Sequence, residues 1–142
     1  MITKSSGFSL IELLVVVAII GILSAAGVLS YQGYIEGAKR NSAENTIQQI
    51  ALAQTEYYSN TGSYFITGGA GSCTANTASS EDIEDNLFDG EDSIADDIDF
   101  EFCVFGNTAS YTVFAQETNT PPGDPVCTIT VTKYGTPQRT DC

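Results

Sequence analysis

The sequence predicts an α+β protein in which one long N-terminal helix supports a C-terminal antiparallel sheet of three to four strands. An uncharged apolar run near the N-terminus continues into a polar stretch with apolar residues every three or four positions, a helical pattern. Three segments near the C-terminus alternate between apolar and polar residues, as strands with one buried face do. The length of 142 residues suits one domain.

The apolar run is long enough to cross a membrane. Seventeen residues from Leu13 to Leu29 carry no charge, and counting from Phe8 gives twenty-two, while about twenty span a hydrocarbon core. Lys4 lies ahead of the run and favours a cytoplasmic leader. One acid, Glu12, interrupts the run. Because an ionised carboxylate inside hydrocarbon costs on the order of 3 kcal/mol, we expect Glu12 to have a partner and a function.

Two simpler interpretations of the apolar run explain less. A secretory signal peptide would be cut at small residues such as Ser24–Ala26, but the helical pattern continues past that point and Glu12 spoils the early apolar run. A plain single-pass anchor leaves Glu12 unexplained.

The motif Gly7–Glu12, GFSLIE, followed by LLVVVAIIGIL, resembles the processing signal of type IV pilins and the related pseudopilins, and Tyr31–Ile35 extends the match. The resemblance implies that a prepilin peptidase cleaves between Gly7 and Phe8 and N-methylates Phe8. It also implies that Glu12 pairs with the Phe8 ammonium of a neighbouring subunit. A buried pair of this kind is better attested as a device that sets register than as a source of net stability.

The sequence departs from the family pattern at two positions. Leu29 stands where many members have a proline, and Gly33 stands where an acidic residue is common. Neither position belongs to the cleavage signal. The missing proline leaves open whether the helix loosens between Gly21 and Gly33.

An amphipathic helix is predicted after Glu36. Its apolar stripe ends near the helix stop Asn60–Gly62 and consists of Ala43, Ile47, Ile50, Ala53 or Gln54, Tyr57 and Tyr58. The predicted sheet, with segments around 98–104, 111–116 and 127–132, needs an apolar cover. The stripe is the available partner.

The segment between helix and sheet is rich in small and acidic residues. A flexible loop tethered by Cys73 is predicted first, then a short helix with Ser80 as its N-cap. Eleven acids and no base lie between Glu81 and Glu101. The best alignment to a calcium loop puts Leu87 at a ligand position, so a solvated acidic surface is favoured, with no metal and no cofactor.

The four cysteines all follow the apolar run, and none forms a CxxC pair. This spacing in an exported domain favours two disulfides over a zinc site, and three pairings are possible. Type IV pilins commonly have a C-terminal disulfide loop, which implies Cys127–Cys142 and leaves Cys73–Cys103. A loop of about fifteen residues closed in this way contributes roughly 3 kcal/mol to stability.

Composition restricts the function. The net charge is −13 with five basic residues, which argues against binding nucleic acid by direct charge contact. There is no histidine, so histidine general bases and histidine metal sites are excluded. No residue is a catalytic candidate, and the protein is not expected to be an enzyme.

The resemblance therefore predicts a structural subunit of a type IV pilus, a homo-oligomeric helical filament that serves attachment, motility or DNA uptake. The precursor would lie in the inner membrane with its head in the periplasm, and would meet prepilin peptidase and the pilus assembly machinery before becoming extracellular. The expected parts are a leader (1–7), a filament-core helix (8–35) and a head (36–142), the head comprising 36–60, 61–97, the sheet 98–135 and the loop 127–142. One alternative is a pseudopilin of a type II secretion system. Another is a membrane-tethered acidic, calcium-dependent binding module.

Overall fold

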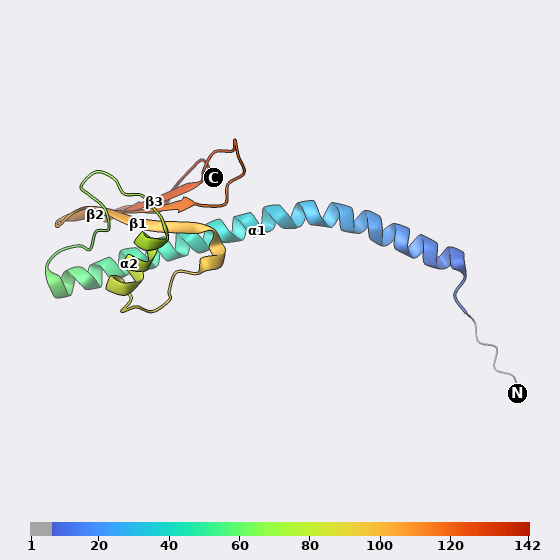
Figure 1. Ribbon diagram of the computed structural model, residues 1–142, viewed down its shortest axis with the longest axis horizontal. Coiled ribbons are helices and arrows are strands. Elements are labelled where there is room, and N and C mark those ends of the chain that lie inside the picture. Colours follow the sequence, from blue (N-terminus) through green and yellow to red (C-terminus); the bar gives the residue numbers. More distant parts are fainter. Residues whose placement is uncertain (1–6) are drawn as a thin grey trace, which may run out of the picture. The chain divides into compact units, whose positions relative to one another are not determined.

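The computed structural model describes residues 7–142, so Lys4 and the rest of the leader before Gly7 lie outside the described residues. The chain divides into two compact units, Met1–Gly37 and Ala38–Cys142. Helix α1, Leu10–Thr61, is one element that begins in the first unit and ends in the second (Figure 1).

The first unit contains the apolar part of α1. Its backbone is helical throughout Gly21–Gly33, where the sequence has no proline. At a rise of 1.5 Å per residue, the twenty residues from Leu10 to Leu29 span about 30 Å, close to the thickness of a hydrocarbon core. The length therefore fits the predicted membrane segment.

The second unit contains a four-stranded antiparallel sheet in the order β1-β2-β3-β4. The strands are β1 Phe100–Asn107, β2 Ser110–Glu117, β3 Thr128–Thr132 and β4 Gln138–Thr140. The first three are the segments whose alternation predicts strands. The fourth lies inside the predicted C-terminal loop, and its three residues are too few to show a period.

The hydrophobic core lies between α1 and one face of the sheet. Ala43, Ile47 and Ile50 of α1 are fully buried, as the predicted stripe requires. They pack in one cluster with alternate strand residues, namely Phe100, Phe102, Val104, Tyr111, Val113, Ala115, Ile129 and Val131. Gln54 continues the stripe as a buried amide that donates to the Phe65 carbonyl at 2.8 Å and accepts from its N–H at 3.0 Å. Both polar ends of this amide are thus satisfied.

The short helix α2, Thr77–Leu87, starts one turn earlier than the sequence analysis expected. Its N-cap is Asn76, not Ser80: the Asn76 side chain accepts from Ser79 N–H at 2.9 Å, and Ser79 Oγ accepts from Asn76 N–H at 3.0 Å. This reciprocal pair satisfies two backbone donors at once, so it outweighs the acids after Ser80 as a start signal. Ser80 lies within the helix, where its hydroxyl contacts β1.

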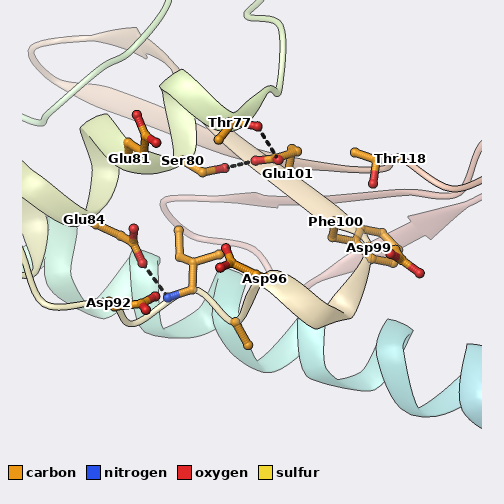
Figure 2. Close-up of a pocket in the computed structure, with 12 residues that line it drawn as sticks. Thr77, Ser80, Glu81, Glu84, Asp92, Asp96, Asp99, Phe100, Glu101 and Thr118 are labelled. Carbon is orange, nitrogen blue, oxygen red and sulfur yellow. Dashed lines mark hydrogen bonds between the residues drawn. The ribbon is translucent and has the colours of Figure 1, made fainter.

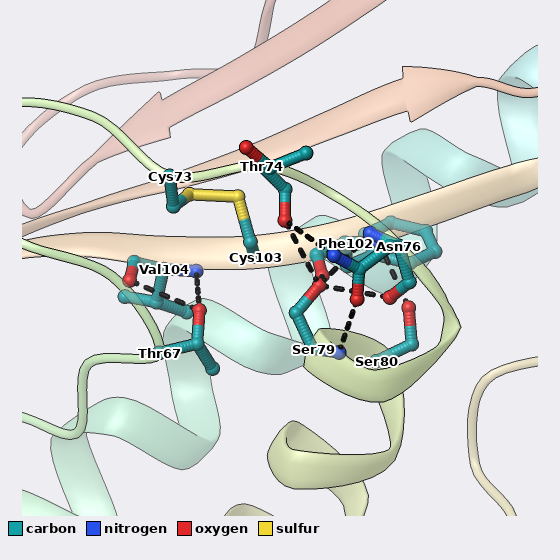
Figure 3. Close-up of a disulfide and its surroundings, with 9 residues drawn as sticks. All are labelled: Thr67, Cys73, Thr74, Asn76, Ser79, Ser80, Phe102, Cys103 and Val104. Atoms are coloured by element: carbon teal, nitrogen blue, oxygen red, sulfur yellow. Dashed lines mark hydrogen bonds between the residues drawn. A yellow bond between two sulfur atoms is a disulfide. The ribbon is translucent and has the colours of Figure 1, made fainter.

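The outer edge of β1 is covered by hydroxyl groups from other segments (Figure 3). Phe102 O accepts from Ser79 Oγ at 2.6 Å, and Phe102 N donates to Ser80 Oγ at 3.0 Å. Two residues along β1, Thr67 Oγ1 accepts from Val104 N at 2.9 Å and donates to Val104 O at 3.2 Å. An unpaired strand edge would otherwise be a template for aggregation. These contacts close the sheet on the α2 side.

Candidate processing and assembly site

The segment from Gly7 to Glu12 leads into α1, and Glu12 caps the start of that helix. Ser9 precedes the first helical residue, and its carbonyl accepts from Leu13 N at 3.3 Å. Glu12 Oε2 accepts a hydrogen bond from Ser9 N–H at 2.9 Å. A glutamate at the third helical position that reaches back to the N-cap amide is half of a capping box. Within one chain, this bond of Glu12 therefore goes to Ser9 rather than to Phe8.

The residues around this segment are uncovered. Phe8 is 86% exposed, and thirteen large apolar side chains between Phe8 and Val28 are exposed in the single chain. Burying a side chain of this size is worth about 1.5–3 kcal/mol, so these thirteen represent on the order of 20–40 kcal/mol. Of the described helices, α1 alone is long and apolar enough to cross a membrane. Either lipid or other apolar helices must supply the missing cover.

In the head, the acidic stretch forms the walls of a pocket of about 280 Å³ between α2 and the start of β1 (Figure 2). Six carboxylates line it, from Glu81, Glu84, Asp92, Asp96, Asp99 and Glu101. Three of them already have partners within the head. Glu84 accepts from the backbone N–H of Ser93 and Ile94, and Glu101 accepts from Thr77 and Ser80.

Asp99 is the third engaged carboxylate, and it forms an ion pair with Lys39 of α1. The hydrogen bond from the Lys39 ammonium is the main cause that lowers the pKa of Asp99. Throughout the part of the chain that the structure describes, no group of three or more carboxylates, cysteines or histidines is arranged to hold a metal ion. The pocket is therefore a negatively charged surface. Three of its carboxylates, those of Glu81, Asp92 and Asp96, form no hydrogen bond or ion pair with the described residues.

Both disulfides are present, Cys73–Cys103 and Cys127–Cys142. The first ties the loop after α1 to β1, which explains why Cys103 is buried on the sheet face away from α1 (Figure 3). The second closes the C-terminal loop that contains β4.

Arg139 of β4 fastens that loop to α1: its Nε donates to Glu44 Oε2 and its Nη2 to Asn41 Oδ1, both at 2.8 Å.

A cluster of tyrosines surrounds Lys133, which follows β3. The Lys133 Nζ lies 4.9 Å from the ring centre of Tyr64, 5.1 Å from that of Tyr134 and 5.8 Å from that of Tyr58. It also donates to the carbonyl of Ala109 at 3.1 Å. The interaction with Tyr64, and then that with Tyr134, raises the pKa of Lys133 above its ordinary value.

Sequence reasoning identified the apolar helix, the cysteines and Glu12, but it missed three features of the head. The hydroxyl cover on β1, the Arg139 clamp and the Lys133 cluster join residues that are far apart in sequence. A fourth missed feature, the Asn76 cap, did have a local signal, a polar residue at each end of the four-residue segment Asn76–Ser79. The others depend on strand register.

Comparisons with known proteins agree with these features. The prokaryotic N-terminal methylation motif matches residues 2–28. A fimbrial protein of Neisseria meningitidis (serogroup A) is 39% identical over 82 residues, which cover 58% of this chain and 46% of the relative. Fimbrial protein EcpC of Eikenella corrodens is 45% identical over 56 residues, covering 39% and 37%. Type IV major pilin protein PilA of Myxococcus xanthus is 36% identical over 56 residues, covering 39% and 26%.

The chain therefore spans less than half the length of these curated relatives, and no solved structure matches it. The methylation motif and the apolar helix are those of a pilin precursor held in the inner membrane and assembled into an extracellular pilus. The family described as type IV minor pilin ComP, DNA uptake sequence receptor, matches residues 30–132, more than half of the chain. The chain belongs to this family of type IV pilins.

Proposed function

We propose that this protein is a structural subunit of a type IV pilus, cleaved between Gly7 and Phe8, methylated on Phe8, and polymerised through α1. The observation that carries the proposal is the apolar half of α1, which follows the methylation motif and is left uncovered by the other described residues. Lipid covers this surface before assembly, and identical helices replace lipid afterwards. Prepilin peptidase and the assembly machinery are the partners that this sequence of events requires.

Glu12 gives the filament its register in this proposal. Inside a bundle of leucine, isoleucine and valine side chains, an unpaired carboxylate is expensive, whereas one that faces a cation recovers much of its desolvation cost. Cleavage after Gly7 creates such a cation, the Phe8 ammonium. The neighbour's Phe8 ammonium then takes the carboxylate that Ser9 N–H holds in the single chain.

Processing is tested by co-expressing the full chain with a prepilin peptidase and measuring the intact mass. The wild-type protein is expected to lose residues 1–7 and to gain one methyl group on Phe8. Gly7→Ala is expected to stay uncut, while the matched control Gly71→Ala, at a position where an added methyl group meets open space, is cut normally. Wild-type protein that keeps its first seven residues contradicts the proposal.

A pseudopilin of a type II secretion system remains the alternative within the superfamily. The disulfide Cys127–Cys142 supports the pilus subunit, because type IV pilins resembling this chain commonly carry such a loop. Electron microscopy separates the two: long surface filaments that contain this protein support the pilus, and short periplasmic assemblies alone support the pseudopilin.

The family description names a DNA uptake sequence receptor, but we propose that this head does not hold DNA through direct charge contact. DNA-binding proteins neutralise phosphates with free lysine and arginine side chains. Here Lys39, Arg40 and Arg139 are each within ion-pair distance of a carboxylate, which leaves Lys133 as the one basic side chain of the described head without such a partner. Fluorescence anisotropy with a labelled duplex is expected to show no saturable binding at physiological salt. Saturable, salt-dependent binding would favour the receptor function instead.

A further inference from the structure

Lys133 stands apart from the other basic residues of the head. Lys39, Arg40 and Arg139 have carboxylate partners, whereas for Lys133 no carboxylate lies within ion-pair distance among the described residues. In a protein of net charge −13, carboxylates are abundant. The lack of a carboxylate partner therefore distinguishes the Lys133 ammonium from the other basic groups of the described head. Instead, tyrosine rings and one carbonyl hold it in place.

The surroundings of Lys133 have the composition of a protein interface. Tyr134 is 88% exposed, Leu52 is 73% exposed and Tyr58 is 41% exposed. Beside them lies a groove of about 360 Å³ between α1 and the β3–β4 connection, lined by Leu52, Thr55 and Lys133 among others. Interface centres are enriched in aromatic side chains such as tyrosine, and complementary charges across an interface fix the register of the partner. We call Leu52, Tyr58, Tyr64, Lys133 and Tyr134 the Lys133 platform.

The complement of the platform is present on the same chain. Three carboxylates of the acidic pocket, from Glu81, Asp92 and Asp96, make no hydrogen bond or ion pair to the rest of the described head, and Figure 2 shows them around the pocket. The pocket adjoins β1, and the platform adjoins the connection between β3 and β4. The pocket is lined by Asp99, Phe100 and Thr118 at the open end of the β1–β2 hairpin, whereas Lys133 donates to Ala109 in the turn at the other end. The two surfaces therefore lie at opposite ends of this hairpin.

This placement prevents one head from pairing its own two surfaces, but it allows one head to pair with the next. A contact between two different surfaces of identical subunits is heterologous, and it repeats into an open helical array unless the rotation closes a ring. Charge complementarity also offsets part of the repulsion between acidic heads.

We propose that the Lys133 platform is a docking surface for the acidic pocket of a second copy of this chain, with Lys133 paired to Asp92, Asp96 or Glu81 of the neighbouring head. The proposal rests on the proposed function, because repeated head contacts are useful in a filament. It assigns a second inter-subunit contact, distinct from that of the apolar helices. The neighbouring carboxylate provides the partner that Lys133 lacks in the single chain.

The contact is tested first by zero-length carbodiimide cross-linking of full-length protein that is an equal mixture of unlabelled and ¹⁵N-labelled chains. Mixed-isotope peptides that join Lys133 to Glu81, Asp92 or Asp96 are expected. This measurement does not need filaments, so it separates the docking contact from the pilus function. If wild-type chains cross-link at Lys133 but form no filament, only the pilus function is overturned. Absence of mixed-isotope cross-links at Lys133 overturns the docking contact.

Charge reversal gives the second test. Lys133→Glu is expected to reduce the filament yield at least tenfold while cleavage after Gly7 stays normal. Adding Asp92→Lys and Asp96→Lys is expected to restore the yield, whereas adding Glu56→Lys, an exposed acid of α1 outside the pocket, is not. Wild-type yield from Lys133→Glu, or a defect that the Asp92 and Asp96 reversals do not repair, overturns the proposal. The latter result points to an occupant other than the acidic pocket.

Discussion

The carboxylate of Glu12 accepts a hydrogen bond from the backbone N–H of Ser9, 2.9 Å away. The acid that the apolar sequence makes conspicuous therefore has a partner before any neighbour arrives. A glutamine can make the same hydrogen bond, since capping boxes accept either residue. Only the ionised glutamate can form an ion pair with an ammonium, so the capping role and the ion-pairing role of this position can be separated by mutation.

Glu12→Gln is predicted to keep the start of α1 intact and to lose assembly. Because the amide oxygen still caps Ser9, we expect wild-type helix content, cleavage and membrane insertion. Because the charge is gone, we expect filament yield to fall as far as it does in Glu12→Ala. Circular dichroism in detergent and the yield of sheared surface filaments measure the two effects. Normal yield from Glu12→Gln would show that the cap, and not the charge, is what assembly needs.

Gly106→Ala is predicted to destabilise the head strongly. Gly106 has a φ of +147°, and an added Cβ would lie 2.3 Å from the carbonyl oxygen of Ser110 across the β1–β2 hairpin. Backbone strain and overpacking each cost about 1–3 kcal/mol, so we expect a loss of about 2–6 kcal/mol. Thermal unfolding of the full chain in detergent measures it.

The matched control for Gly106 is Gly123→Ala. Gly123 also has a positive φ, +99°, but no atom lies within 4 Å of its added Cβ. It therefore carries the strain without the clash, and we expect a loss of about 1–3 kcal/mol. Equal losses at the two positions would mean that the hairpin relaxes around the methyl group.

Arg139→Ala is predicted to loosen the C-terminal loop locally without unfolding the head. The guanidinium joins β4 to Asn41 and Glu44 of α1, but exposed ion pairs contribute only about 0.2–1 kcal/mol. We expect faster amide exchange across Gln138–Thr140 and a small change in melting temperature.

The comparison for Arg139 is the double variant Cys127→Ser, Cys142→Ser. Removing the bridge is expected to cost about 3 kcal/mol in the free energy of unfolding, because the unfolded chain gains entropy. A larger loss from Arg139→Ala than from the double variant would show that the clamp, rather than the disulfide, holds the loop.

The Lys39–Asp99 pair is predicted to stabilise the head only where Asp99 is ionised. Lys39 lowers the pKa of Asp99 in the folded state. The stabilisation is therefore fully present above the unfolded value near 3.9 and is lost as the pH falls through the lower folded pKa. Both side chains are about 30% exposed, so we expect about 0.2–1 kcal/mol.

A double-mutant cycle with Lys39→Met and Asp99→Asn isolates this pair from the other carboxylates. The coupling energy is expected to be constant from pH 5 to pH 7 and to decline below pH 4. Coupling that grows as the pH falls would contradict the prediction, because it would mean that the pKa of Asp99 is raised in the folded state and not lowered.

Local patterns were enough to predict most of the helices and strands. Apolar residues at helical spacing identified the buried face of α1 at Ala43, Ile47 and Ile50, because a helix repeats every 3.6 residues. Alternation identified β1 to β3. The start of α2 was predicted wrongly at Ser80, because the reciprocal bond between Asn76 and Ser79 competes with it and wins.

The sequence by itself determined the membrane-length helix, the position of Glu12 within it and the acidic character of the head, since these depend on composition and short-range order. Only the tertiary structure decided that Ser79 and Ser80 cover the edge of β1, that Arg139 reaches Glu44, and that Lys133 lies among tyrosines. Such contacts join residues separated by tens of positions. They follow from strand register and from the packing of α1 on the sheet, which no local pattern specifies.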